Sequence, residues 1–276
     1  MSKSDSDTAD MNVATYPAEA DERWKQYDWQ VIPGEPVAPP VNLALDEVLT
    51  KTVGQGARTP TLRIWRWAAP CIVIGRFQSV QNEVQAENAE RLGVQIVRRI
   101  SGGGAMFIQP ENAITWSIHV PPSFVEGLSF PQSYAFLDSW VVSALRELGI
   151  DAWYIPLNDI TSAGGKIGGA AQARRFGGVL HHTTMAYDMD PTLMLQVLRI
   201  GQEKLSDKGL RSADKRVGPL RQQTNLPRDT IIDFLIDRFT ALTGGQPGRV
   251  TDTEMADAET LVQEKFGTQE WTYLLP

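Results

Sequence analysis

Cysteine and histidine are scarce in this chain of 276 residues, which holds one cysteine, Cys71, and three histidines. A single thiol excludes an intramolecular disulfide and a cysteine-rich zinc site, and it is typical of the reducing cytoplasm. A histidine-based metal site would need all of His119, His181 and His182, or help from carboxylates. Disulfide scaffolds and zinc-finger folds are therefore excluded.

Long apolar runs and excess positive charge are also missing. No apolar run approaches the roughly 20 residues of a membrane-spanning helix. The net charge is −7, so a large basic surface for nucleic acid is not expected. The acidic N-terminus lacks the basic start and apolar centre of a signal peptide. We predict a cytoplasmic protein that binds neither membrane nor nucleic acid, with a mobile acidic tail over residues 1–23 and one domain over residues 24–276.

Glycine is concentrated in two stretches, and the first, RRISGGGAMF at residues 98–107, follows an apolar segment at residues 94–97. Three consecutive glycines give no side chains to a core, but they let the backbone turn tightly and cradle an anion with N–H groups. The two preceding arginines add positive charge suited to carboxylate or phosphate. The stretch predicts an anion site, although it matches neither the P-loop nor the GxGxxG pattern.

The second stretch, GGKIGGAAQ at residues 164–172, follows Asn158 and Asp159. Lys166 stands alone among glycines, where its amine can reach a phosphate oxygen as a point charge. We read the segment as strand–turn–strand, which would direct Lys166 toward the first glycine turn. The basic segment at residues 205–220 is a further candidate for anion binding. The central prediction is that Lys166 and residues 102–104 meet across one cavity.

The hydrophobic pattern predicts an α+β fold in which helices pack on a mixed β-sheet. Strands without regular βαβ alternation favour this class over a doubly wound fold. Besides the segments above, strands are predicted at residues 24–32, 61–67, 71–74, 113–120 and 177–188. Helices are predicted at residues 42–52, with Asn42 as N-cap, and at residues 80–92, 133–149, 191–198, 229–242 and 254–266.

Several reactive side chains receive a structural interpretation. Asp46 and Glu47 occupy adjacent helix positions that do not share a face, so we read them as solvated charges rather than an acid–base pair. Cys71 has no neighbouring base or cation to lower its pKa and reads as a small buried hydrophobe. The consecutive His181 and His182 point to opposite faces of a strand, so one of them can line a pocket.

Taken in order, these segments resemble the catalytic domain of lipoate–protein ligases. That domain belongs to the biotin/lipoate ligase superfamily, whose fold is related to class II aminoacyl-tRNA synthetases. The motifs that carry the resemblance lie at residues 42–47, 74–78, 98–104, 158–159, 166–172, 178–182, 207–209, 215–217 and 270–273. One departure is Ile108, which stands where the family usually has a histidine.

The resemblance implies that ATP activates lipoate, or octanoate, to an acyl-adenylate, and that the acyl group then passes to a lysine of a lipoyl carrier domain. Lys166 corresponds to the family's catalytic lysine, which contacts both the acyl carbonyl and the α-phosphate. The implied positions for ATP or adenylate are Arg99, Ser101, Gly102, Gly103, Gly104, Ala105, Met106, Phe107, Asn158, Asp159 and Lys166. Those for the lipoyl group are Gly75, Arg76, Lys166, Gly169 and His182, with residues 72–74 along the acyl tunnel. Mg²⁺ is implied as cofactor, with Asp159 as its ligand.

The resemblance also implies partners. The acyl acceptor would be an E2 subunit, a glycine-cleavage carrier or a specialised lipoate-binding protein. The chain stops where the catalytic domain of the family ends, whereas many family ligases continue into a small C-terminal domain. We therefore expect a separately encoded accessory subunit, and poor adenylate formation by this chain alone.

Three other functions are alternatives to ATP-dependent ligation. Octanoyltransferases of the same fold carry octanoyl as a thioester on a cysteine shortly before the lysine motif or well after it. Cys71 lies at neither position. A biotin ligase-like enzyme fits the lysine and glycine motifs less well. A non-catalytic module that holds lipoyl-AMP or a lipoyl domain is the third alternative.

Overall fold

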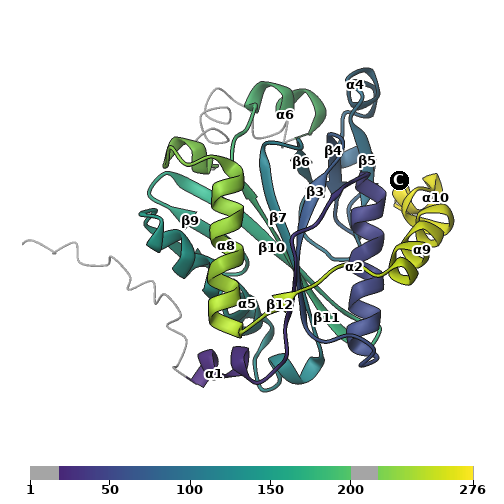
Figure 1. Ribbon diagram of the computed structural model, residues 1–276. Coiled ribbons are helices and arrows are strands. Elements are labelled where there is room, and N and C mark those ends of the chain that lie inside the picture. Colours follow the sequence, from purple (N-terminus) through teal and green to yellow (C-terminus); the bar gives the residue numbers. More distant parts are fainter. Residues whose placement is uncertain (1–18, 200–216, 276) are drawn as a thin grey trace, which may run out of the picture.

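The computed structural model describes residues 19–199 and 217–275 (Figure 1). Of the predicted acidic tail, residues 1–18 lie outside the described residues, and Glu19–Lys25 form helix α1. Most of the basic segment at residues 205–220 also lies outside them. No helix within the described ranges is long and apolar enough to cross a membrane.

A mixed sheet forms the centre of the described chain, as the sequence predicted. Its nine strands follow the order β12–β1–β3–β7–β11–β10–β9–β8, with β2 beside β3. The pairs among β12, β1, β3 and β2 are parallel, and the remaining pairs are antiparallel. The bounds are β1 (Gln30–Ile32), β2 (Pro36–Val37), β3 (Thr61–Trp67), β7 (Ala113–Val120), β8 (Ala152–Ile155), β9 (Asp159–Ser162), β10 (Gly165–Arg175), β11 (Gly178–Ala186) and β12 (Gln246–Pro247).

A second, three-stranded sheet carries the first glycine stretch. It consists of β5 (Gln95–Arg98), β4 (Cys71–Ile74) and β6 (Met106–Ile108). β4 pairs in parallel with β5 and antiparallel with β6. The glycine turn, residues 101–105, connects β5 to β6 and therefore lies at one end of this small sheet.

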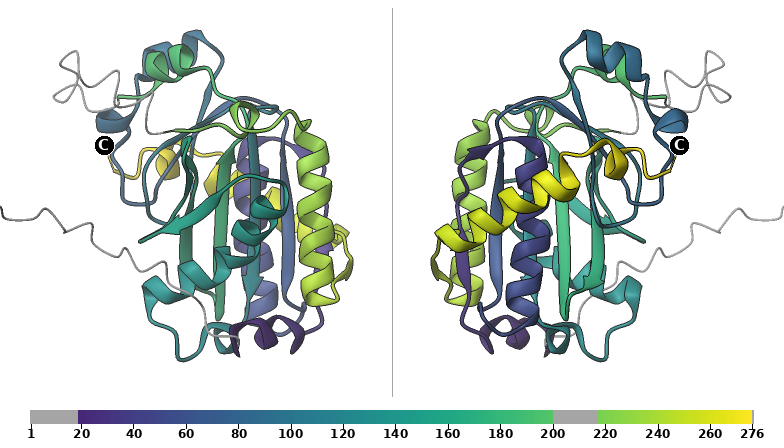
Figure 2. Two further views of the ribbon diagram at one scale, coloured as in Figure 1. Left: turned by 90° about the vertical axis from the view of Figure 1, so that its left-hand side faces the viewer. Right: turned by 90° about the vertical axis from the view of Figure 1, so that its right-hand side faces the viewer.

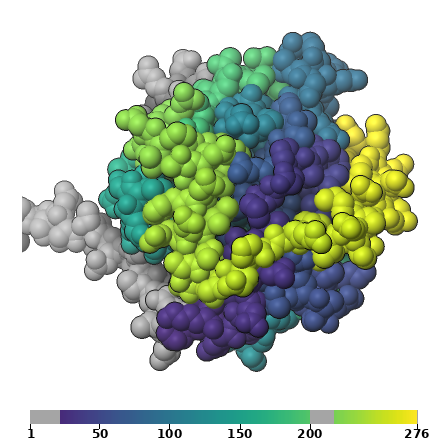
Figure 3. Space-filling view, viewed as in Figure 1, coloured from purple at the N-terminus to yellow at the C-terminus, as the bar shows by residue number. Residues whose placement is uncertain are grey.

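Helices cover both faces of the large sheet. On one face α5 (Phe130–Glu147) and α8 (Arg228–Thr243) enclose an aromatic core, in which Trp24 contacts Phe124 with ring centroids 5.1 Å apart. On the other face α2 (Pro39–Gly54) packs against α9 (Asp252–Leu261). The right-hand view of Figure 2 shows α9 crossing α2, and Figure 3 shows the C-terminal segment reaching the edge of the molecule. Because both faces are covered, β7 is buried at every position, although its alternating sequence is typical of a strand with one exposed face.

The remaining elements are short. The sheet is followed or flanked by α3 (Val80–Glu83), α4 (Ala86–Arg91), α6 (Pro191–Val197) and α10 (Gln269–Thr272), by the 3₁₀ turns η1 (Pro122–Val125) and η3 (Leu220–Gln222), and by the π-helical turn η4 (Val262–Phe266). α3 and α4 replace the single helix predicted at residues 80–92. The break falls at Val84, whose extended backbone bridges Leu198.

Two predicted element starts were wrong. The strand predicted at residues 24–32 is helix α1 followed by β1, because Trp24 turns into the aromatic core. Helix α2 begins at Pro39 after Ala38, not after Asn42. Proline is tolerated in a first helical turn, where the missing N–H would have no partner. Asn42 lies within the helix, and its Nδ2 donates to the carbonyl of Arg66 at 2.9 Å.

Candidate functional site

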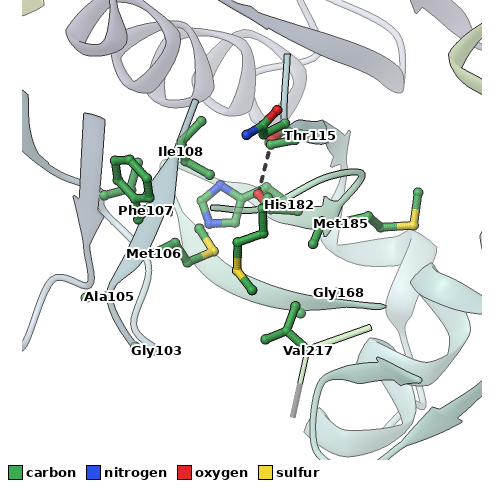
Figure 4. A pocket seen from close by; sticks show the side chains of 18 of the residues that line it. Gly103, Ala105, Met106, Phe107, Ile108, Thr115, Gly168, His182, Met185 and Val217 are labelled. Atoms are coloured by element: carbon green, nitrogen blue, oxygen red, sulfur yellow. Dashed lines mark hydrogen bonds between the residues drawn. The ribbon is translucent and has the colours of Figure 1, made fainter. Parts of the chain in front are cut away.

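A cavity of about 470 Å³ lies where the small sheet meets the large one. Its wall is largely apolar and combines side chains from β3, β4, β6, β7, β10 and β11. Figure 4 shows Met106, His182 and Met185 around this space. Of the predicted acyl-tunnel stretch 72–74, only Val73 lines the cavity, because Ile72 and Ile74 face the opposite side of β4 and pack against α3 and α6.

Lys166 and the glycine turn share this cavity. The lining includes Gly103, Gly104 and Lys166 together, which is the juxtaposition that the sequence predicted. The Lys166 amine lies 2.7 Å from a carboxylate oxygen of Asp159, and both side chains are partly exposed. A side chain on Gly169 would place its Cβ 3.2 Å from the amine. The absence of a side chain at this position leaves room for the ion pair.

Asn158 fixes the start of the strand that carries the acidic partner. Its Nδ2 donates to the carbonyl of Ala170 at 2.7 Å, and its own carbonyl accepts the N–H of Ala170 at 2.9 Å. Asn158 and Lys166 both line the cavity. These hydrogen bonds join the residue before β9 to β10, close to the point where the amine enters the cavity.

The two arginines before the glycine turn bind backbone carbonyls. Arg98 is fully buried and donates to carbonyls of residues 75, 76, 78, 271 and 272. Arg99 lines the cavity, but its guanidinium donates to the carbonyls of Gly102 at 2.6 Å and Gly104 at 2.8 Å. Burial lowers the pKa of Arg99 to about 10. The Arg99 guanidinium therefore holds the turn, whereas the Arg98 guanidinium holds residues 75–78 and the C-terminal segment and does not line the cavity.

Gly75 and Arg76 lie behind the turn, and neither lines the cavity. An added Cβ on Gly75 would lie 2.1 Å from the carbonyl oxygen of Gly103, so the two backbones touch only because Gly75 has no side chain. Arg76 instead stacks over Trp271, 5.0 Å from the ring centroid. Gly102 is also outside the lining, and Phe77 lies beside it.

Asp46 is a site residue that sequence reasoning missed. It was expected on a solvated face, but it is 1% exposed, and neighbouring Glu47 is buried against Lys265. Its Oδ2 lies 2.8 Å from His182 Nδ1, and its Oδ1 accepts from Ser117 at 2.6 Å. Burial alone would raise the pKa of Asp46, but the hydrogen bond and charge of His182, with the charge of Arg63, lower it.

A signal for this burial was present in the sequence. Asn42, Asp46 and Thr50 follow one another at intervals of four residues, so they share a face of α2, and all three are buried. The facing strand β3 supplies Arg63, which binds Asn42 at 2.9 Å and Asp46 at 3.3 Å. A polar stripe of this kind indicates a buried hydrogen-bond network when the sheet beside it carries matching polar side chains.

The two consecutive histidines point to opposite faces of β11, as predicted. His182 lines the cavity, and its Nε2 lies 2.6 Å from the hydroxyl of Ser101. Burial lowers the pKa of His182. His181 faces α5 and lies 2.9 Å from Asp138. Ser101 itself is 1% exposed and does not line the cavity.

Neither a reactive thiol nor a preformed metal site accompanies the cavity. Cys71 is fully buried on β4, does not line the cavity, and has a pKa raised by burial. Among the described residues, no group of three or more His, Cys, Asp or Glu side chains could hold a metal ion. Asp159, the predicted magnesium ligand, forms an ion pair with Lys166. Ile108 presents a buried apolar side chain to the cavity.

Comparison with known proteins shows the family to which the chain belongs. Residues 38–240 match the family described as the lipoyl protein ligase A/B catalytic domain. An octanoyltransferase LipM from Kyrpidia tusciae is 29% identical, over 84% of this chain and 93% of the relative.

Two solved structures share the fold. One belongs to a bi-partite lipoate protein ligase studied with its E2 lipoyl domain, from Thermoplasma acidophilum. It has a TM-score of 0.78 and 27% identity, with coverage of 90% of this chain and 97% of that one. The other is a lipoate-protein ligase A bound with ATP. It has a TM-score of 0.76 and 25% identity, with coverage of 89% and 98%.

Proposed function

Because the chain belongs to the lipoyl protein ligase A/B catalytic domain family, we propose that it joins lipoate or octanoate to a lysine of a lipoyl carrier domain through an acyl-adenylate made from ATP. The observation that carries this proposal is a single cavity that combines an apolar wall, the glycine turn and the Lys166 amine without a thiol. The ATP-bound structure among the relatives supports the choice of nucleotide.

The apolar wall suits a medium-length acyl chain. Each buried methylene contributes about 0.8 kcal/mol, so the six methylenes of an octanoyl chain would contribute about 5 kcal/mol at most. A cavity of about 470 Å³ is within the size range of small-molecule sites. The acyl carboxylate would then lie toward Lys166 and the glycine turn, where polar groups converge.

Lys166 would stabilise negative charge in both steps of the reaction. In the first step a carboxylate oxygen bonds to the α-phosphorus of ATP, and the bond to pyrophosphate breaks. In the second step the carrier lysine attacks the acyl carbonyl, AMP leaves with the electrons of the anhydride bond, and the amine loses its proton. The Lys166 ammonium offsets the negative charge that develops on oxygen in each step. Asp159 orients it from 2.7 Å.

Magnesium would bind mainly through the phosphates of ATP, with few ligands from the protein. Asp159 beside Lys166 and Asp188 in the cavity wall are candidate ligands, and the described residues hold no preformed cluster. Mg²⁺ commonly binds through one or two carboxylates together with substrate phosphates. The ion would therefore accompany ATP into the site, and its binding by Asp159 would compete with the Lys166 ion pair.

Octanoyl transfer from an acyl carrier is the second candidate, and the relative from Kyrpidia tusciae favours it. A thioester route needs an accessible thiolate, because the thiolate is the nucleophile. The chain holds one cysteine, and Cys71 is 0% exposed and does not line the cavity. An octanoyltransferase built on this chain would have to transfer the acyl group without that intermediate.

The test compares two acyl donors by the intact mass of a lipoyl domain. We expect the protein, with its accessory subunit if one is required, to acylate the domain with octanoate, ATP and Mg²⁺. Octanoyl-acyl carrier protein without ATP should give no product, and Cys71→Ser should retain the activity. ATP-independent transfer from the carrier would establish the second candidate and overturn the first.

A preformed lipoyl-adenylate separates catalysis from binding. The ligase should pass the lipoyl group from this compound to the domain faster than the uncatalysed reaction. Protein that binds the adenylate but leaves the domain mass unchanged would be a binding module. Lys166→Ala is the control that keeps the cavity and removes the amine.

A further inference from the structure

A buried chain of hydrogen bonds links helix α2 to the glycine turn through the cavity wall. Asp46 Oδ2 lies 2.8 Å from His182 Nδ1, and His182 Nε2 lies 2.6 Å from Ser101 Oγ. The exposed fractions of these residues are 1%, 7% and 1%. The three side chains come from α2, from β11 and from the start of the turn, and they meet only in the folded protein.

The direction of each hydrogen bond in this chain follows from its neighbours. Asp46 is ionised and accepts, so the proton of neutral His182 lies on Nδ1 and its Nε2 has a free lone pair. The Ser101 hydroxyl therefore donates to Nε2. Ser101 Oγ in turn accepts from Arg99 Nε at 3.1 Å. The chain thus runs from Arg99 through Ser101 and His182 to Asp46 in one direction.

The same chain is attached to both ends of the glycine turn. Arg99 donates at once to Ser101 and to the carbonyls of Gly102 and Gly104. The carbonyl of Ser101 accepts the N–H of Arg76 at 2.8 Å. Three consecutive glycines lose much backbone entropy when they adopt one conformation. An ordered turn therefore depends on contacts such as these from its flanks.

The order of Ser, His and Asp invites comparison with a nucleophilic triad, but the burial argues for another role. A nucleophile must reach the acyl carbonyl, whereas Ser101 does not line the cavity and its oxygen already accepts from Arg99. His182 does line the cavity, and its own partner Asp46 does not. The geometry suits a structural link that holds the glycine turn against helix α2.

We propose that Asp46, His182 and Ser101 are positioning residues that fix the glycine turn at the cavity, and that they hold it most firmly while His182 is neutral. A protonated Nε2 would donate to Ser101 Oγ, which would then accept from two cations, His182 and Arg99, while its own hydroxyl hydrogen loses its acceptor. The proposal rests on the proposed function for its catalytic consequence, but the anchoring itself needs no substrate. The titratable and charged groups around His182 and its partner Asp46 are Arg63, Arg99, His119 and, on the opposite face of β11, His181.

The first measurement is hydrogen exchange of the backbone amides at residues 101–105 in the protein without substrate. Ser101→Ala should raise their exchange roughly 10- to 100-fold, because a buried hydrogen-bond partner is lost. Asp138→Asn is the matched control. It alters the other buried Asp–His pair of β11, at His181, on the face away from the cavity. It should leave exchange in the turn unchanged.

The second measurement is the pH dependence of the same exchange, corrected for the intrinsic rate. The pKa of His182 is lowered by burial, so the turn should keep its protection at pH 6.5 and lose it at a more acidic pH. In Ser101→Ala, exchange of the turn should no longer rise in acid, whereas acid-dependent exchange elsewhere in the protein should persist. In the acylation assay, Ser101→Ala should lower kcat more than it changes KM for the acyl substrate.

Three results would overturn the proposal. Unchanged exchange of the turn in Ser101→Ala would show that the chain does not anchor it. If Asp138→Asn raised the exchange of the turn equally, Asp46, His182 and Ser101 would contribute only to the general stability of the protein. An acyl group found on Ser101 by mass spectrometry would make it a nucleophile. Loss of the proposed ligase function would leave the exchange results standing, so the two failures can be told apart.

Discussion

Replacement of Gly75 by alanine tests how the glycine turn is positioned. The added Cβ would lie 2.1 Å from the carbonyl oxygen of Gly103, whereas ordinary contact begins at 3.4 Å. Both groups are backbone, so the turn must move by about 1.3 Å. A displacement of about 1 Å at a reacting centre can cost about 100-fold in rate. We expect kcat/KM for acylation of the lipoyl domain to fall by about that factor.

The fold should tolerate this change at a moderate loss of stability. Overpacking costs about 1–3 kcal/mol, and each kcal/mol lowers Tm by about 2–4 °C in a protein of this size. Gly104→Ala is the stability control, because an added Cβ there meets nothing within 4 Å. Acylation kinetics and thermal unfolding of both variants provide the measurement. A Gly75→Ala protein with wild-type kcat/KM would refute the inference that this contact positions the turn.

Four other predictions follow from the site. Lys166→Ala should lower kcat about 100- to 1,000-fold, as expected for loss of a group that stabilises developing charge, with little change in Tm because the side chain is 42% exposed; a near-normal rate would remove Lys166 from the chemistry. Gly169→Ala should displace the amine and lower kcat about tenfold, whereas Gly168→Ala should chiefly destabilise the fold, since its Cβ would lie 2.7 Å from the Thr184 carbonyl; equal melting temperatures would contradict this. Cys71→Ser should keep full acylation activity in the mass assay, and its inactivity in a folded protein would revive the thiol route. Pyrophosphate release by the chain alone should be slow and should rise when a separate accessory subunit is added; rapid release by the chain alone would show that no such subunit is required.

Much of the fold could be predicted because the buried strands carry their own signal. The alternation at residues 61–67 and the continuous apolar run at residues 71–74 gave β3 and β4 with the correct bounds. α1 and the broken helix at residues 80–92 could not be predicted locally. Trp24 is drawn into an aromatic core by residues far along the chain, and Val84 is held extended by its bridge to Leu198.

The candidate site could likewise be predicted only in part from the sequence. The glycine turn and Lys166 could be paired from the sequence because glycine and lone lysine residues signal a ligand by type alone. The partners of Asp46 lie 17 and 136 positions away, at Arg63 and His182. A carboxylate changes from solvated to buried only when such partners assemble around it. The arginines were likewise read as anion ligands, because only the folded turn shows the carbonyls that engage them.

The most direct measurement of the central claim is a crystal structure with a non-hydrolysable octanoyl-adenylate analogue. The account predicts the octanoyl chain in the apolar cavity and the Lys166 amine within about 3 Å of both the acyl carbonyl oxygen and the group that replaces the phosphate. An analogue that binds elsewhere, or that binds here while the amine remains on Asp159 and contacts neither group, would contradict it.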